Sequence, residues 1–325
     1  MLGTQVDGLG LPLSQLVLGT MTFGDTVEAT VAASMVDAAI DAGITVIDTA
    51  NGYAGGASEE ILGSILQRRR DSVLLATKAG MPHPDSGEHS PLSAKGLLQS
   101  VHGSLRRLQV DRIDLFYLHQ PDRATPVEET MLVIAELMKQ GTIGALGISN
   151  FAAWQISELN HIADAIGTPR PVVAQQLYSL VARRIEDEYL EFAHATGLKT
   201  MVYNPLGGGL LTGKYEFADV PTGGRFGGSR LADLYRQRYW DPRLFDAVAA
   251  LKTIADGAGM TLVELSLRWL VSSPDVDAIL IGASRVEQLR SNLLAALTGP
   301  LPADLVAACN EVGRELRGPM SNYNR

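Results

Sequence analysis

The sequence predicts an α/β protein built as a (β/α)8 TIM barrel, with an N-terminal β-hairpin and a long loop after strand seven. Short β-branched runs alternate with stretches of helical periodicity along the whole chain, which is the pattern of parallel strands joined by helices. Eight such units occur with no composition break or linker between them. We therefore expect one barrel domain over residues 1–325, a length that single barrels commonly reach.

The first element is the hairpin, whose turn we expect around Gly8 and Leu9. The eight strands that follow are short and rich in aliphatic and β-branched residues. Their predicted bounds are 16–18, 45–48, 73–77, 113–118, 144–148, 172–176, 200–203 and 278–281. A doubly wound open sheet is the competing arrangement, but the first strand is not followed by the GxGxxG sequence of many dinucleotide-binding sheets.

The helices between the strands have apolar stripes and end signals. Leu97, Val101, Leu105 and Leu108 repeat at helical spacing behind a candidate N-cap at Ser93. A stripe of this kind is expected to pack against the strands.

Two later helices are predicted to begin with capping boxes. The first box is TPVE at residues 125–128, in a helix that ends at Gly141, and the second is SRVE at residues 284–287 in the last helix. Between strand seven and its helices, residues 205–240 are rich in glycine and arginine. Loops of that length are usually functional or mobile.

Composition and charge narrow the class of protein. The chain is 46% hydrophobic and 19% charged, which describes a globular protein with a large core. Its formal charge of 27 − 36 = −9 argues against a broad surface for nucleic acid or for an anionic membrane. No run approaches the roughly 20 apolar residues that span a bilayer, and the first residues lack the features of a signal peptide.

The single cysteine, Cys309, points to a reducing compartment. It can form no intrachain disulfide and cannot anchor a zinc cluster of the cysteine type. We expect a small buried hydrophobic residue in a cytoplasmic protein.

Polar residues lie at the carboxyl ends of nearly all predicted strands. In a barrel these ends face the active-site mouth, so polar residues there are functional more often than elsewhere. Singly, each has an ordinary structural explanation, but together they predict an active site. They are Asp48, Lys78, His119, Ser149, Asn150, Gln175 and Tyr203, with Tyr53 five residues beyond Asp48 on the same loop.

The chemistry of this set favours a proton donor over a metal centre. One histidine and no cysteine are too few ligands of the usual kind for zinc. The ammonium of Lys78 would stabilise the phenolate of Tyr53 and lower the pKa of that phenol, while Asp48 would keep Lys78 charged. His119 would either orient a substrate carbonyl or share the proton, and the residue types leave both roles open.

Segments between Leu18 and about Leu297 resemble the aldo-keto reductase superfamily. They are LGTMTFGD, VIDTANGYAGGASEEILG, ATKAG, DLFYLHQPD, GISNF, QQLY, YNPLGGGLLTGKY and IGASRVEQLRSNL. The runs YLHQPDRATPVEET, YNPLGGGLLTGKY and GRFGGS, with a tail ending NYNR, resemble the branch of aflatoxin-aldehyde and succinic-semialdehyde reductases.

The resemblance implies a catalytic tetrad of Asp48, Tyr53, Lys78 and His119, with Tyr53 as the general acid and hydride transfer from C4 of the nicotinamide of NADPH. Ser149, Asn150 and Gln175 would bind the carboxamide, and Tyr203 would stack on the ring. The residues expected at the cofactor are Gly19, Thr20, Met21, Asp48, Ser149, Asn150, Gln175, Tyr203, Asn204, Pro205, Leu206, Gly207, Gly209, Lys214, Arg225, Ser284, Arg285, Gln288 and Asn292.

An independent argument concerns the cofactor phosphates, because barrels often bind phosphate with the loops after strands seven and eight. The glycines at 207–209 allow close backbone approach to a pyrophosphate, and Lys214 adds charge nearby. Ser284 and Arg285 lie at a predicted helix N-terminus, which favours an anion such as the 2′-phosphate of NADPH. Gln288 and Asn292 follow one and two turns later and match the family's adenosine-phosphate contacts.

Some positions depart from patterns common in the family. Ala283 replaces a lysine found in many members, so the predicted preference for NADPH rests mainly on Arg285. Met21 replaces a tryptophan of some members, and Asn51-Gly52 precede Tyr53, so the substrate pocket is harder to interpret. The candidates for a substrate carboxylate or a cofactor phosphate are Arg225, Arg230 and Arg325.

These expectations describe an enzyme that reduces aldehydes or ketones to alcohols with NADPH, acting on a small carbonyl substrate. Two alternatives use the same residues. A Schiff-base lyase or aldolase would use Lys78, because a lysine at the end of a barrel strand can hold a carbonyl substrate covalently. A module that binds NADPH and senses redox state for a partner would have slow or vestigial chemistry.

Overall fold

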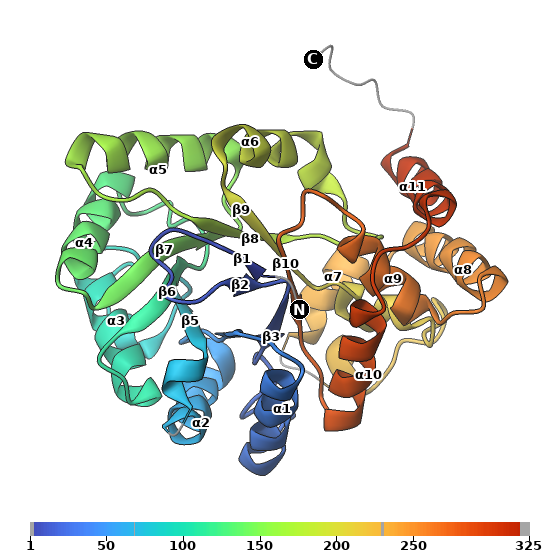
Figure 1. Ribbon diagram of the computed structural model, residues 1–325, viewed down its shortest axis with the longest axis horizontal. Coiled ribbons are helices and arrows are strands. Elements are labelled where there is room, and N and C mark those ends of the chain that lie inside the picture. The colour runs from blue at the N-terminus through green and yellow to red at the C-terminus, as the bar shows by residue number, and fades with distance from the viewer. Residues whose placement is uncertain (1–2, 68, 229–230, 319–325) are drawn as a thin grey trace. The chain divides into compact units, whose positions relative to one another are not determined.

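The computed structural model describes residues 3–67, 69–228 and 231–318 (Figure 1). Arg230 and Arg325, two of the candidate substrate-binding arginines, lie outside the described residues. The chain divides into two compact units, each described by itself below. The first comprises Met1–Gln176, Glu186–Met201 and Asp277–Leu293, and the second comprises Leu177–Ile185, Val202–Val276 and Leu294–Arg325. The single domain over residues 1–325 stays a prediction.

Eight strands of the described residues form a closed parallel barrel in the order β10-β3-β4-β5-β6-β7-β8-β9. The predicted fold class is therefore confirmed. The strands are β3 (Leu16–Gly19), β4 (Val46–Asp48), β5 (Leu74–Ala79), β6 (Ile113–Leu118), β7 (Ile143–Ser149), β8 (Val173–Leu177), β9 (Lys199–Tyr203) and β10 (Ala278–Ile281).

The predicted strands agree with these bounds to within two residues, and β6 and β10 agree completely. One difference concerns the site. The prediction placed Lys78 after its strand, whereas β5 continues through Ala79 because Lys78 and Ala79 pair in register with Tyr117 and Leu118 of β6. Lys78 is therefore held by backbone pairing as well as by its side chain.

The predicted N-terminal hairpin is confirmed as two antiparallel strands, β1 (Gly3–Thr4) and β2 (Leu13–Ser14). Figure 1 shows this hairpin across the centre of the barrel. Val6 and Leu13 belong to the same buried cluster as Val17, Val46 and Leu115 from the strands. The hairpin therefore closes the interior at the amino ends of the strands, and the opposite end is left for the site.

Helices surround the strands of the first unit (Figure 1). They are α1 (Ala29–Asp41), α2 (Ala57–Leu66), α3 (Ala94–Leu108), α4 (Val127–Lys139), α5 (Ala153–Ile166), α6 (Tyr189–Thr196) and the part of α10 (Val286–Leu297) up to Leu293. The N-cap predicted for α3 is confirmed, since Ser93 Oγ accepts a hydrogen bond from the amide of Gly96 at 3.3 Å.

The two predicted capping boxes are wrong in detail. The N-cap of α4 is Pro126, because the hydroxyl of Thr125 instead donates to Asp122 Oδ2 at 2.8 Å. At α10, Gln288 replaces the predicted glutamate at 287, since Gln288 Oε1 accepts from both the amide and the hydroxyl of Ser284. In both places a side chain outside the four-residue pattern competes for the capping hydroxyl.

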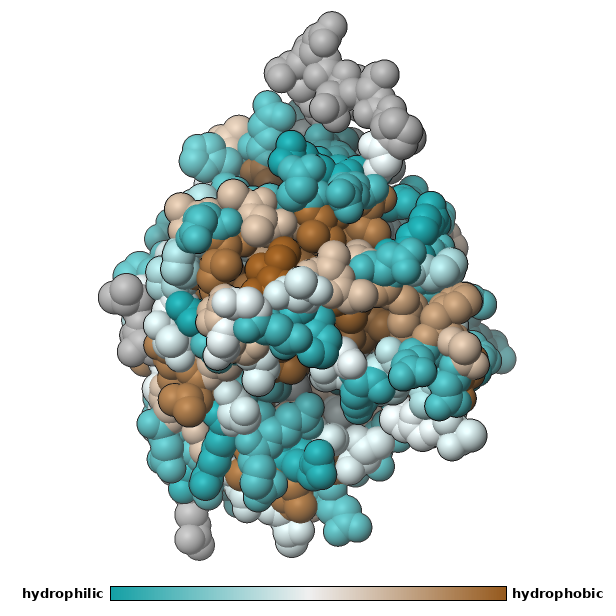
Figure 2. All heavy atoms as spheres, turned by 90° about the vertical axis from the view of Figure 1, so that its right-hand side faces the viewer, coloured by the Kyte–Doolittle hydropathy of each residue, from teal (hydrophilic) through white to brown (hydrophobic). Residues whose placement is uncertain are grey.

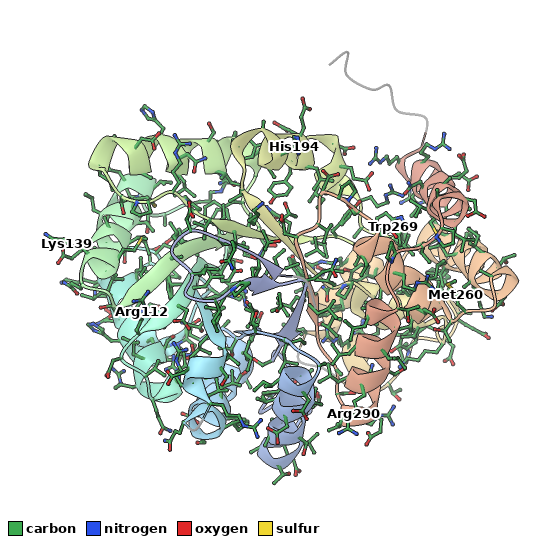
Figure 3. All side chains as sticks on the ribbon, in the orientation of Figure 1. Arg112, Lys139, His194, Met260, Trp269 and Arg290 are labelled. Atoms are coloured by element: carbon green, nitrogen blue, oxygen red, sulfur yellow. The ribbon has the colours of Figure 1, made fainter. Side chains whose placement is uncertain are left out.

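The second unit contains α7 (Ala232–Tyr239), α8 (Pro242–Gly257), α9 (Leu262–Val271) and α11 (Ala303–Arg317). Helices α8 and α11 pack together. Trp269 of α9, labelled in Figure 3, packs on Tyr178 at 5.1 Å between ring centroids and donates from Nε1 to Asn310 of α11. Cys309 is buried, as expected. In the space-filling view of Figure 2, hydrophobic side chains gather in a band between hydrophilic ones.

The predicted long loop at residues 205–240 contains more regular structure than expected. It includes the 3-10 helix η5 (Gly207–Thr212), the 3-10 turn η6 (Gly224–Phe226) and α7. An aromatic cluster orders this segment, because the ring of Phe226 lies 5.1 Å from those of Tyr215 and Trp240 and 6.3 Å from that of Tyr235. Packing of these aromatic rings therefore favours regular structure here despite the many glycines.

Within the part of the chain that the structure describes, every helix is too short or too polar to cross a membrane. The same residues contain no group of three histidine, cysteine or acidic side chains arranged to hold a metal ion.

Candidate active site

Lys78 and Tyr53 form the centre of the candidate site. Lys78 Nζ lies 3.3 Å from Tyr53 Oη and donates to the carbonyl of Thr49 at 2.8 Å. It also forms an ion pair and hydrogen bond with Oδ1 of Asp48. Asp48 and Lys78 are fully buried. Since an ammonium has three donors, these three acceptors account for all of them and fix its direction.

The charge on Lys78 follows from its partners. Burial disfavours the ammonium, but the carboxylate of Asp48 and the hydroxyl of Tyr53 outweigh burial, so the pKa of Lys78 lies above its usual value. Lys78 is therefore a cation at neutral pH, held against the phenol. This geometry matches the arrangement that the sequence analysis required.

The turn that holds Tyr53 is unusual. It is the 3-10 turn η1 (Tyr53–Gly56), in which Ala54, Gly55 and Gly56 have positive φ angles of 49°, 66° and 102°. An alanine in the left-handed region is strained by about 1 kcal/mol or more. Such strain persists only where the surroundings determine the conformation, and here it places the phenol over the ammonium.

Three hydroxyl groups connect the residues on either side of this turn. Thr20 Oγ1 donates to the carbonyl of Asp48 at 3.0 Å, and Ser58 Oγ lies 2.9 Å from the hydroxyls of Thr20 and Thr49. All of these residues are buried. Thr20 was expected to contact the cofactor, and the structure gives it a role in holding the backbone of Asp48.

His119 completes the predicted tetrad. Its ring lies edge-on to that of Tyr53, with 5.9 Å between the centroids. Burial, with the charge of Lys78 adding to it, lowers the pKa of His119 to about 3. The imidazole is therefore neutral at physiological pH. Of the two roles that the sequence left open, a neutral donor that orients a carbonyl fits this environment better than a shared proton.

The residues predicted to bind the carboxamide lie together beside the tetrad. Gln175 donates from Nε2 to Asp48 Oδ2 at 3.0 Å, and the backbone carbonyl of Gln175 accepts from Ser149 Oγ at 2.9 Å. Asn150, at a positive φ of 63°, donates from Nδ2 to Ser149 Oγ and to the carbonyl of His119. Ser149, Asn150 and Gln175 therefore share one hydrogen-bonded network with Asp48 and Lys78.

The structure also contains features that the sequence did not indicate. Asn51 is fully buried, and neither Nδ2 nor Oδ1 of its side chain has a partner among the described residues. The sequence also did not predict the hydrogen bond from Lys78 to the carbonyl of Thr49 or the one from Gln175 to Asp48. No local pattern signals these contacts, because each joins a backbone or amide group to a residue on another strand or loop.

Some of the residues predicted to bind the cofactor phosphates have hydrogen-bond partners within the protein. In the first unit, Ser284 bonds Gln288, Arg285 is exposed, and Asn292 has a buried Nδ2 without a partner among the described residues. In the second unit, Arg225 donates to Tyr235 Oη at 2.9 Å and to Asn204 Oδ1.

The glycines at 207–209 all have positive φ, as a loop that needs glycine requires. A Cβ at Gly208 would lie 2.6 Å from the ring of Tyr235, which gives packing as a reason for this glycine. Lys214 lies over the ring of Tyr215, 4.9 Å from the centroid.

The fold and this geometry define a barrel protein with a group of buried ionisable side chains at the carboxyl ends of its strands. Comparison with known proteins identifies its family. A sequence model of the Aldo/keto reductase family matches residues 15–314, and the chain belongs to that family. It is therefore an oxidoreductase of aldehydes and ketones, and the family implies a nicotinamide cofactor.

Similar proteins support this membership. The chain is 37% identical to aflatoxin B1 aldehyde reductase member 2 of Rattus norvegicus, over 97% of this chain and 89% of that protein. It is also 37% identical to aldo-keto reductase family 7 member A3 of Homo sapiens, over 95% and 96%. A probable voltage-gated potassium channel subunit beta of Arabidopsis thaliana is 34% identical, over 91% and 92%. The predicted resemblance to the superfamily and to the aflatoxin-aldehyde reductase branch is confirmed.

Proposed function

We propose that this protein reduces aldehydes or ketones to alcohols with NADPH, and that Tyr53 donates the proton to the carbonyl oxygen. The observation that supports the proposal is the contact of 3.3 Å between Lys78 Nζ and Tyr53 Oη, with Lys78 held by Asp48. A general acid in this position typically contributes a factor of about 10² to 10⁴ in rate.

Each member of the tetrad has a distinct task in this proposal. Tyr53 holds the proton at Oη, and the ammonium of Lys78 stabilises the phenolate that remains after proton transfer. Asp48 keeps Lys78 charged and directed. His119, neutral because its pKa is about 3, orients the carbonyl oxygen by hydrogen bonding. NADPH, when bound, would supply the hydride.

The residues present fit a nicotinamide carboxamide. The Gln175 amide donates to Asp48 through Nε2, which directs its oxygen as an acceptor, while Ser149 and Asn150 lie in the same hydrogen-bonded network. At α10, the buried Nδ2 of Asn292 and the exposed Arg285 would meet the adenosine phosphate. The contacts of Tyr203, Pro205, Leu206 and Lys214 with the cofactor stay predictions from sequence.

The test is NADPH oxidation with 4-nitrobenzaldehyde, methylglyoxal and succinic semialdehyde, repeated with NADH. We expect turnover with at least one carbonyl and a lower KM for NADPH than for NADH. Lack of activity on every carbonyl would reject the proposal. We also propose a cytoplasmic location, which the lone buried cysteine supports.

The aldolase alternative conflicts with the state of Lys78. A Schiff-base lysine must react as the neutral amine, whereas the pKa of Lys78 is raised by Asp48 and Tyr53 against the effect of burial. Borohydride in the absence of nucleotide is therefore expected to trap no substrate on Lys78.

The alternative of a redox-sensing module has one observation in its favour, the 34% identity to a probable channel subunit. Stopped-flow measurement of hydride transfer separates the two functions. We expect transfer on the timescale of turnover rather than vestigial chemistry.

A further inference from the structure

Three charged side chains of the first unit, Glu59, Arg107 and Asp85, form a hydrogen-bonded cluster. Glu59 of α2 is fully buried, and its Oε2 accepts from Arg107 Nε of α3 at 2.8 Å. Nη1 and Nη2 of Arg107 donate to the two oxygens of Asp85 at 3.0 and 2.6 Å. Asp85 belongs to the 3-10 turn Pro84–Ser86 after β5. One guanidinium thus connects two helices and a loop.

The cluster touches the turn that carries Tyr53. Gly56 ends that turn, and a Cβ at Gly56 would lie 2.8 Å from Arg107 Cδ and 2.9 Å from Arg107 Nε. The Arg107 side chain therefore packs directly on the backbone of Gly56. Glycine adopts the φ of 102° found at Gly56 readily, and the contact with Arg107 fixes the position of this end of the turn.

The cluster also reaches the strand that carries Lys78. Glu59 Oε1 accepts from the hydroxyl of Thr77 at 2.5 Å. Thr77 is buried and immediately precedes Lys78 on β5. Arg107 and Glu59 therefore contact both segments whose separation sets the distance between Tyr53 Oη and Lys78 Nζ.

Two glycines, Gly63 of α2 and Gly103 of α3, allow the close packing around this cluster. A Cβ at Gly103 would lie 2.4 Å from Asp85 Oδ2, and a Cβ at Gly63 would lie 2.3 Å from the carbonyl oxygen of Arg107. Buried ion pairs commonly stabilise a fold no more than apolar side chains of similar volume, because both charges lose their hydration. Stability alone is therefore a poor explanation for the cluster.

We propose that Arg107 and Glu59 are positioning residues for the acid–base pair. Arg107 fixes the turn that holds Tyr53, and Glu59 fixes β5 beside Lys78, so the cluster sets the contact between phenol and ammonium. This inference rests on the proposed reductase function.

The experiment is a double-mutant cycle between Arg107→Met and Tyr53→Phe. The rate of single-turnover reduction of 4-nitrobenzaldehyde by bound NADPH is measured in all four proteins. If Arg107 acts through Tyr53, Arg107→Met lowers the rate about tenfold or more when Tyr53 is present and less than about twofold in the Tyr53→Phe background.

Arg70→Met is the matched control. Arg70, like Arg107, is partly buried, and it pairs with Asp114 at 2.7 Å. It donates to the carbonyl of Val73 just before β5, at the end of the strand opposite Lys78. We expect this variant to lose stability without losing more than about twofold in rate. If Arg107→Met does not fold, Arg107→Lys and Glu59→Gln enter the same cycle, with thermal unfolding as the check of folding.

The outcomes separate the inference from the proposed function. Equal losses of rate in both Tyr53 backgrounds, or equal losses for Arg70→Met and Arg107→Met, would overturn the inference and leave the reductase function intact. A wild-type protein that reduces no carbonyl would reject the function and this inference with it.

Discussion

Gln175 donates from its side-chain nitrogen to Oδ2 of Asp48 at 3.0 Å, across 127 residues of sequence. The other oxygen of Asp48 accepts from Lys78. Gln175, which the sequence predicts to bind the carboxamide of the cofactor, therefore also holds the carboxylate that pairs with Lys78. This relationship would couple the proposed cofactor site to the proposed acid–base pair.

Tyr53→Phe removes the proposed proton donor and leaves the ring in place. We expect turnover to fall by about 10² to 10⁴, because a general acid contributes that much. The dissociation constant for NADPH, measured by fluorescence titration, should stay within about twofold. Loss of NADPH binding with the rate of bound cofactor unchanged would contradict the role of Tyr53.

Gln175→Leu leaves one oxygen of a fully buried carboxylate without its partner. We expect a loss of about 1–3 kcal/mol in the free energy of unfolding and at least a tenfold loss in kcat. Gln176→Leu is the control, since Gln176 is also buried but donates to the carbonyl of Phe151 at 2.8 Å. Urea unfolding and steady-state kinetics on both variants check this prediction. A similar loss of kcat in the two variants would argue against it.

The depressed pKa of His119 predicts a pH dependence of stability. Burial and Lys78 lower that pKa from 6.5 to about 3, so the unfolded chain binds a proton between these values while the folded chain does not. Stability due to neutral His119 is thus present above pH 6.5 and is lost as pH falls below it. Between pH 7 and 4.5 we expect wild type to lose about 2 kcal/mol more than His119→Gln.

Urea unfolding of both proteins at several pH values measures this difference, and the other titrating groups cancel in the comparison. Parallel loss of stability in the two proteins would show that His119 is not held neutral by the fold.

Arg285→Ala tests the proposed site for the 2′-phosphate. Arg285 is exposed beside Ser284, just before α10 begins at Val286. We expect KM for NADPH to rise about tenfold while KM for NADH stays nearly constant, since only NADPH has the extra phosphate. Arg290→Ala is the control, because Arg290 (Figure 3) is exposed farther along the same helix. Equal changes for both cofactors would exclude phosphate recognition by Arg285.

The sequence by itself determined the barrel and grouped the residues proposed for acid–base chemistry. Strand periodicity is local, so the eight strands could be placed to within two residues. The closure of a barrel then brings strand ends together, which is why Asp48, Lys78 and His119 could be grouped without coordinates. The resemblance of the motifs to a family added the roles of Tyr53 and of the cofactor-binding residues.

Only the tertiary structure decided how these residues are held. The bond from Gln175 to Asp48, and the contact of Arg107 with Gly56, join positions that are remote in sequence. The neutral state of His119 depends on burial and on the distance to a charge. Local patterns determine which backbone forms, whereas hydrogen-bond partners and protonation depend on distances that exist only after the chain has folded.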